Sequence, residues 1–126
     1  MSWLGATVYL DRAAIVRTLA EVSRLAPGAE LVLDHLLPAR LRDPAGRAHA
    51  DLVGPLAAGA GEPWLTFLGP GAMSALLRRG GFRTLEHATQ FDAVDPALWQ
   101  DRVDPLRPVT LAAFIRARAL PRAADQ

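Results

Sequence analysis

The apolar residues of this sequence change spacing along the chain, from continuous runs to stripes at helical spacing and back, as they do in α/β proteins. Residues 3–10, WLGATVYL, are apolar or small without alternation, which predicts a strand covered on both faces. Asp11 can cap a helix over residues 11–25, whose buried face would hold Ala14, Ile15, Thr18, Leu19, Val22 and Leu25. The run ELVLDHLLP at 30–38 predicts a second buried strand, and the three elements form a right-handed βαβ unit.

Residues 39–79 carry two further stripes at helical spacing. The first predicts a loop and then a helix that breaks near Gly54-Pro55, because proline lacks an amide proton; its apolar stripe is Ala48, Leu52, Val53, Leu56 and Ala57. The second predicts a helix from about Gly71 to Arg79 that ends at Gly80-Gly81 and turns inward Met73, Leu76 and Leu77.

The last third of the chain returns to strand patterns. Residues 82–91, FRTLEHATQF, alternate and predict a strand with Phe82 and Leu85 among its buried positions. The stretch VDPALWQ at 94–100 predicts one short helical turn after its Asp-Pro start. Residues 109–120 contain enough alanine for a helix, but a period of two favours an edge strand with Leu111, Ala113, Ile115 and Ala117 on one side.

Composition limits what a chain of 126 residues with these elements can do. The length suits one domain, here residues 1–120, followed by a frayed tail at 121–126. Fourteen basic residues oppose thirteen acidic ones, and a net charge of +1 argues against a nucleic-acid partner. The chain has no cysteine, no apolar run near the ~20 residues of a membrane span and no secretory signal. We therefore expect a cytoplasmic protein without a membrane partner.

Several sequence blocks occur in the order found in one enzyme family. They are GxTxYL with an acidic cap at residues 5–11, PGxELVxD at 27–34 and GEPWxxF…GF at 61–82. Together they resemble the C-terminal half of class I S-adenosylmethionine-dependent methyltransferases of the leucine carboxyl methyltransferase-like family, which contains many bacterial small-molecule O-methyltransferases. The resemblance runs from about Trp3 to Leu120. It implies the second half of a doubly wound, Rossmann-like sheet with helices on its faces, in which parallel strands end in an antiparallel hairpin at the sheet edge.

The same resemblance implies that part of the cofactor site lies outside these residues. The family places a Gly-rich loop after its first strand and an acidic residue after its second, whereas residues 3–10 here correspond to its fourth strand. The glycines of this chain stand in isolated turns or end a helix, so they do not replace that loop. We therefore expect a partial methyltransferase domain without a complete S-adenosylmethionine site.

The carboxyl ends of the first two predicted strands form the candidate site, because ligands of open α/β sheets bind there. By resemblance, Gly5, Thr7 and Tyr9 flank the cofactor. The alternative for Thr7 and Tyr9 is that they are packed strand residues whose hydroxyl groups form hydrogen bonds within the protein. Many family members carry a glutamate where this sequence has Leu4, so that polar contact does not carry over.

Four further residues are candidates for contact with the substrate. Asp34 and His35 end the second strand; Asp34 is expected to contact substrate, and His35 to orient an acidic substrate or to act as a catalytic base, with a structural histidine as the alternative. Trp64 and Phe67 lie in the excursion that covers the substrate in the family, where they suit a flat acceptor or simply pack the lid onto the sheet. The histidines share no metal-ligand spacing, so no metal is predicted.

Three functions are compatible with these residues. The first is a partial O-methyltransferase for a hydroxyl or carboxylate of a small molecule, which is inactive alone and needs an N-terminal-half partner. The second is a non-catalytic remnant or interaction module that forms a homodimer through the exposed edge of its first strand. The third is a free-standing binder of small ligands that uses Trp64 and Phe67.

Overall fold

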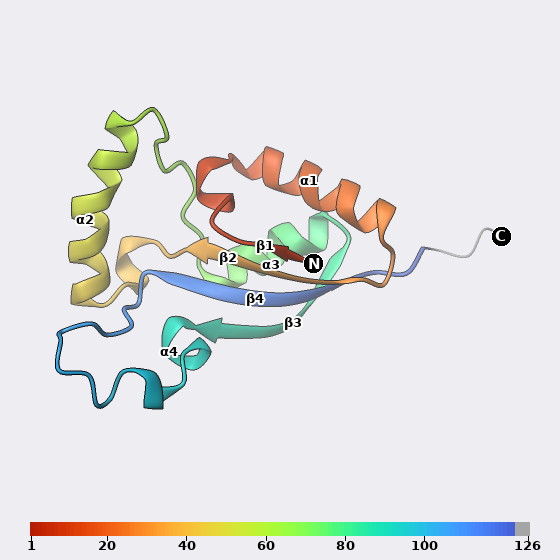
Figure 1. Cartoon of the computed structure of the whole chain (residues 1–126). Helices are drawn as coiled ribbons and strands as arrows, with labels where there is room; N and C mark the ends of the chain where they lie inside the picture. Colours follow the sequence, from red (N-terminus) through yellow and green to blue (C-terminus); the bar gives the residue numbers. More distant parts are fainter. Residues whose placement is uncertain (123–126) are drawn as a thin grey trace.

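A four-stranded mixed sheet forms the centre of the protein, and the computed structural model describes residues 1–122. The strand order is β1-β2-β4-β3 (Figure 1). β1 pairs with β2 in parallel, and β4 lies antiparallel between β2 and β3. The bounds of the strands are Ser2–Trp3 for β1, Glu30–Leu36 for β2, Phe82–Thr89 for β3 and Ala112–Ala119 for β4. The predicted α/β class, with a parallel pair that continues into antiparallel strands, is confirmed. Part of the predicted tail, residues 123–126, lies outside the described residues.

Helices and short 3-10 turns connect the strands. The α-helices are α1 (Arg12–Leu25), α2 (Pro44–Gly59), α3 (Pro70–Arg79) and α4 (Gln90–Ala93), and the 3-10 turns are η1 (Thr7–Tyr9), η2 (Ala39–Leu41) and η3 (Pro96–Leu98). The helices predicted over 11–25 and 71–79 are confirmed, as is the short turn predicted within 94–100.

The first predicted strand, over residues 3–10, is wrong beyond Trp3, where the chain leaves the sheet. Gly5 adopts φ +69°, a backbone region that suits glycine, and the chain then winds into η1. The carbonyl of Val8 accepts hydrogen bonds of 2.7 and 3.2 Å from two amides of residues 65–66 instead of pairing with a strand. Only Thr7 and Val8 of this run are buried, in a turn beneath residues 65–66, while Leu4 and Tyr9 are exposed. Hydrophobic periodicity alone does not distinguish such a turn from a buried strand.

α1 and α3 pack against each other on one face of the sheet. Asp11 caps α1 by accepting the amide of Ala14 at 2.7 Å. The expected helices on the sheet faces are thus present on this face, and the shared core consists of Ile15, Leu19, Leu31, Leu33, Leu68, Met73, Leu76, Leu77, Phe82, Ile115, Ala117 and Ala119. Two residues predicted on the buried face of this helix are instead exposed: Thr18, and Leu25, which is 71% exposed at the last position of α1.

A glycine at the end of α3 allows α1 to approach closely. A Cβ on Gly80 would lie 2.4 Å from the Cβ of Leu19 in α1, a distance that real contacts do not show. Gly81 follows with φ +86° and turns the chain into β3. The predicted helix stop at these two glycines is confirmed, and Gly80 also sets the spacing between the two helices.

α2 stands at the end of the sheet and not over its face (Figure 1), and two sequence predictions fail for it. The helix continues through Pro55 without the predicted break. Its predicted apolar stripe is not buried, since Leu52 and Leu56 are 68% and 66% exposed. The helix is held by its first turn instead, where the Asp43 carboxylate accepts the amide of Thr110 at 3.1 Å. Because α2 stands at the end of the sheet, the helical spacing of its apolar residues does not predict their burial in the core.

β4 lies inside the sheet, so the edge position predicted for residues 109–120 is wrong and β3 is the edge strand. The strand assignment itself is confirmed, and alternate residues from Ala113 to Ala119 are buried as the period of two predicts. β3 and β4 are antiparallel as expected, but a long connection that includes α4 and η3 joins them. Phe82 is buried as predicted, whereas Leu85 is only half-buried because the β3 register shifts beside it.

Neither α1 nor α3 covers the second face of the sheet, which carries paired charges. Successive strand residues point to opposite faces, so Glu30, Glu86, Arg116 and Arg118 lie away from the core. Arg116 lies between the two glutamates, with N–O distances of 3.3 Å to Glu30 and 3.2 Å to Glu86, and Arg118 also pairs with Glu30. We call these four residues the charged face.

Candidate functional site

The carboxyl ends of β1 and β2 bring four predicted site residues together. The amide of Gly5 donates to Oδ1 of Asp34 at 2.7 Å, and Oγ1 of Thr7 donates to the Asp34 carbonyl oxygen at 3.0 Å. His35 follows directly on β2, and these residues line a hollow of about 40 Å³. We call Gly5, Thr7, Asp34 and His35 the strand-end site.

The strand-end site by itself does not fit S-adenosylmethionine. A hollow of about 40 Å³ holds a few waters, since one water needs roughly 10–15 Å³ of such space. The Gly5 amide and the Thr7 hydroxyl both donate to Asp34, so neither proton is available to a ligand in this arrangement. Tyr9 lies outside the hollow and is 40% exposed. The cofactor contacts predicted for these residues therefore need additional surface from elsewhere.

His35 is surrounded like a structural histidine. Its side chain is 2% exposed, and Nδ1 lies 2.7 Å from the carbonyl oxygen of Leu68. Because a carbonyl only accepts, Nδ1 carries the proton of the neutral ring. Burial lowers the pKa of His35 and favours this neutral form, while Nε2 is enclosed without a hydrogen-bond partner among the described residues. A base must reach the proton it removes, and the catalytic role of His35 stays a prediction.

Residues 62–69 form an irregular segment, here called the strap, that contacts the strand-end site at His35. Its two inward residues are Thr66, whose hydroxyl donates to the carbonyl of Leu10, and Leu68, whose amide donates to the carbonyl of Leu36 at 2.8 Å. These bonds connect the strap to Leu10, which precedes α1 in sequence, and to Leu36, which follows it at the end of β2. They also place the Leu68 carbonyl where it meets His35.

Trp64 and Phe67 lie on the strap but not in the hollow. Trp64 is half-buried against α2, where a Cβ on Gly54 would lie 3.8 Å from the indole ring. Phe67 is 36% exposed, and the guanidinium carbon of Arg42 lies 5.1 Å from its ring centroid. The two aromatic side chains therefore occupy different environments, and their contact with a substrate stays a prediction.

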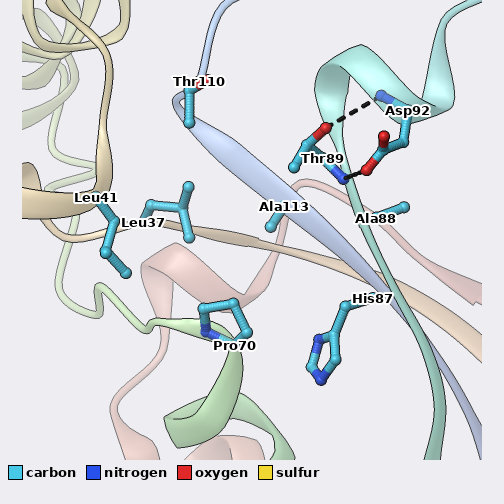
Figure 2. A pocket seen from close by; sticks show the side chains of 9 residues that line it. All are labelled: Leu37, Leu41, Pro70, His87, Ala88, Thr89, Asp92, Thr110 and Ala113. Carbon is cyan, nitrogen blue, oxygen red and sulfur yellow. Dashed lines mark hydrogen bonds between the residues drawn. The ribbon is translucent and has the colours of Figure 1, made fainter.

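Sequence reasoning missed a larger pocket, shown in Figure 2, which has a volume of about 260 Å³. Its walls come from η2, the first residue of α3, the end of β3 and the start of β4. We call it the side pocket; its lining is Leu37, Leu41, Pro70, His87, Ala88, Thr89, Asp92, Thr110 and Ala113. No local sequence motif predicts it, because four separate segments contribute, residues 37–41, 70, 87–92 and 110–113.

Residues 1–122 contain neither a cluster of metal-ligating side chains nor a helix that could span a membrane. No three side chains of the metal-ligating types gather there in a group that would hold an ion. None of the helices in this part of the chain is both long enough and apolar enough to cross a membrane.

Comparison with known proteins shows a shared fold. No protein-family model matches the chain, and no curated protein matches it. A crystal structure described as a possible exported protein from Bordetella parapertussis superposes with a TM-score of 0.60 at 17% sequence identity. The match covers 94% of this chain and 38% of that one. This chain therefore spans well under half the length of its structural neighbour, and the likeness concerns the fold alone.

Proposed function

We propose that this chain is the C-terminal half of an S-adenosylmethionine-dependent O-methyltransferase domain and is inactive without an N-terminal half. The observation that carries the proposal is the meeting of Gly5, Thr7 and Asp34 at the carboxyl ends of a parallel strand pair. Ligands of open α/β sheets bind at that edge. The strand arrangement, with two parallel strands followed by an antiparallel pair, also matches what the sequence resemblance implies.

The free edge of β1 is where a second half would join. Among the described residues β1 pairs only with β2, and the adjoining Met1 and Leu4 are 65% and 56% exposed. A further parallel strand there would continue the sheet and enlarge the hollow of the strand-end site. The cofactor supplies its own leaving group, so the protein mainly has to hold acceptor and methyl carbon in line. That requirement suits a site built from two halves.

A second candidate rests on the same edge. Unpaired strand edges with exposed apolar side chains tend to pair with other chains. A second copy of this chain could form hydrogen bonds with the free edge of β1 in place of an N-terminal half. In that case the chain is an interaction module that forms a homodimer.

Calorimetric titration with S-adenosylhomocysteine tests the first proposal. We expect no binding by the chain alone, and micromolar binding by a chimera in which the N-terminal half of a family methyltransferase precedes Met1. In the chimera, Gly5→Ala should weaken binding about tenfold because alanine is strained at positive φ. Gly61→Ala is the matched control, since Gly61 has φ +82° and also has open space around it, away from the strand-end site.

Different results would overturn different parts of the proposal. Cofactor binding or methylation of phenols and carboxylic acids by the chain alone would refute its dependence on an N-terminal half. A folded chimera that does not bind would refute the methyltransferase function, and a chimera that does not fold would refute the joining of the two halves at β1. Light scattering on the chain alone addresses the second candidate. A dimer that Leu4→Asp disrupts supports that candidate, and a monomer refutes it.

A further inference from the structure

We propose that the side pocket binds a neutral single-ring molecule that presents one hydrogen-bond acceptor to His87. The pocket shares no lining residue with the strand-end site. It also needs no second half, because all its walls come from the described residues. The proposal is therefore independent of methyl transfer.

The chain at Thr110, which lines the pocket, is held in place by hydrogen bonds from two neighbouring segments. The amide of Thr110 donates to Asp43 at 3.1 Å, and the amides of Leu111 and Ala112 both donate to Oε1 of Gln90, at 3.0 and 3.1 Å. These three consecutive residues lead into β4 and are thus anchored from α2 on one side and from α4 on the other. Sites for small molecules are usually preformed in this way.

The apolar lining and the volume indicate a single ring. Leu37 and Ala113 are each 5% exposed and form an inner wall, whereas Leu41 keeps 42% of its surface exposed beside the pocket. Gly69 leaves room for Leu41, because a Cβ there would lie 3.1 Å from its Cδ1. The volume of about 260 Å³ exceeds the ~150 Å³ that accommodates benzene and falls short of the ~300 Å³ at which drug-sized sites begin.

His87 supplies the polar contact. Oγ of Ser74 lies 2.8 Å from Oγ1 of Thr84 and 3.2 Å from Nε2 of His87. When Thr84 donates to Ser74 and Ser74 donates to Nε2, each hydroxyl proton is used once and the neutral imidazole carries its proton on Nδ1. The ring faces Pro70 across the pocket in Figure 2. In this arrangement Nδ1, which makes no hydrogen bond within the described residues, is a donor to a ligand carbonyl or ether oxygen.

Asp92 sets the charge of the ligand. Asp92 lines the pocket, and its carboxylate accepts a hydrogen bond from the amide of Thr89 at 2.8 Å. This hydrogen bond lowers the pKa of Asp92, which stays ionised at neutral pH. A fixed negative charge beside the pocket disfavours anionic ligands. The largely apolar lining also disfavours a cation, because burying an unpaired charge is costly, and the ligand is therefore neutral.

Titration of the isotope-labelled chain by heteronuclear NMR tests the proposal with three probes, acetophenone, toluene and benzoate. We expect saturable shifts of the Ala88, Thr110 and Ala113 amides with acetophenone, with a Kd of about 1 mM or tighter. Toluene lacks the acceptor and benzoate carries a charge, so each should bind at least about fivefold more weakly.

Two variants locate the contact. Leu41→Ala should weaken acetophenone about fivefold, whereas Leu56→Ala, which removes a side chain of similar exposure on α2, should not. His87→Leu should make acetophenone and toluene bind equally. Saturable binding that follows this pattern supports the proposal. It is overturned by no saturable shift up to about 10 mM, by shifts elsewhere, by equal effects of the two leucine variants, or by equal binding of the three probes to the native chain.

Discussion

Replacing Gly80 with alanine should push α1 away from α3 and destabilise the fold. The new Cβ would lie 2.4 Å from the Cβ of Leu19, which is completely buried and has no room to retreat. Restoring an ordinary contact requires about 1 Å of helix separation, and overpacking of this kind costs about 1–3 kcal/mol. The backbone of Gly80, with φ −85° and ψ 6°, accepts alanine, so its lower unfolded-state entropy returns about 0.4–1 kcal/mol. We expect a net loss of about 1–2 kcal/mol.

Gly71→Ala in the first turn of the same helix is the matched control. A Cβ at Gly71 meets nothing within 4 Å, so this variant should gain about 0.5–1 kcal/mol. Urea unfolding followed by circular dichroism measures both free energies of unfolding, and their difference should be about 2 kcal/mol. If Gly80→Ala were within about 0.5 kcal/mol of the native chain, α1 would not be fixed against α3 and the description of the core would be wrong.

The remaining predictions concern how the free energy of unfolding depends on pH through His35 in the strand-end site and through Asp43 at the start of α2. Burial lowers the folded-state pKa of His35 below its ordinary 6.5, so the unfolded chain binds more protons and the free energy of unfolding should fall as pH drops below that value. His35→Leu should flatten this slope between pH 7.5 and 5.5, and an unchanged slope would contradict the assignment. Hydrogen bonds, foremost from the Gly46 amide, lower the pKa of Asp43; its contribution is complete above 3.8 and is lost as pH falls below that value. Asp43→Ala should therefore cost about 1 kcal/mol at pH 7 in urea unfolding and nothing once Asp43 is protonated in the native chain.

Local signals predicted the parts of the fold that local energetics decide. Asp11 identified the start of α1, Gly80 and Gly81 the end of α3, and the period of two the buried side of β4. Long-range pairing decided the rest. The run from Trp3 to Leu10 is apolar in a strand or in a buried turn, and only bonds to the distant strap determine which. The interior place of β4 likewise depends on β2, which lies far away in sequence.

The candidate site shows the same division. Gly5, Thr7, Asp34 and His35 were predicted together because the carboxyl ends of adjacent parallel strands share one edge. The side pocket was missed because the sequence pattern of the edge strand β3, which carries His87, does not predict that His87 contacts Ser74 on α3. The volume of the side pocket depends on the distances between the segments that line it, and the sequence of any one segment does not determine these distances.

The charged face restricts how any additional layer can sit on this sheet. Covering Glu30, Glu86, Arg116 and Arg118 would remove four partly hydrated ions from water, and their mutual attraction rarely offsets that loss. A covering layer is therefore favoured only where these ions keep contact with solvent. The two faces of the sheet therefore differ in what they tolerate: α1 and α3 bury one face, while the opposite face, which crosses β2, β4 and β3, is stable as a surface in contact with water.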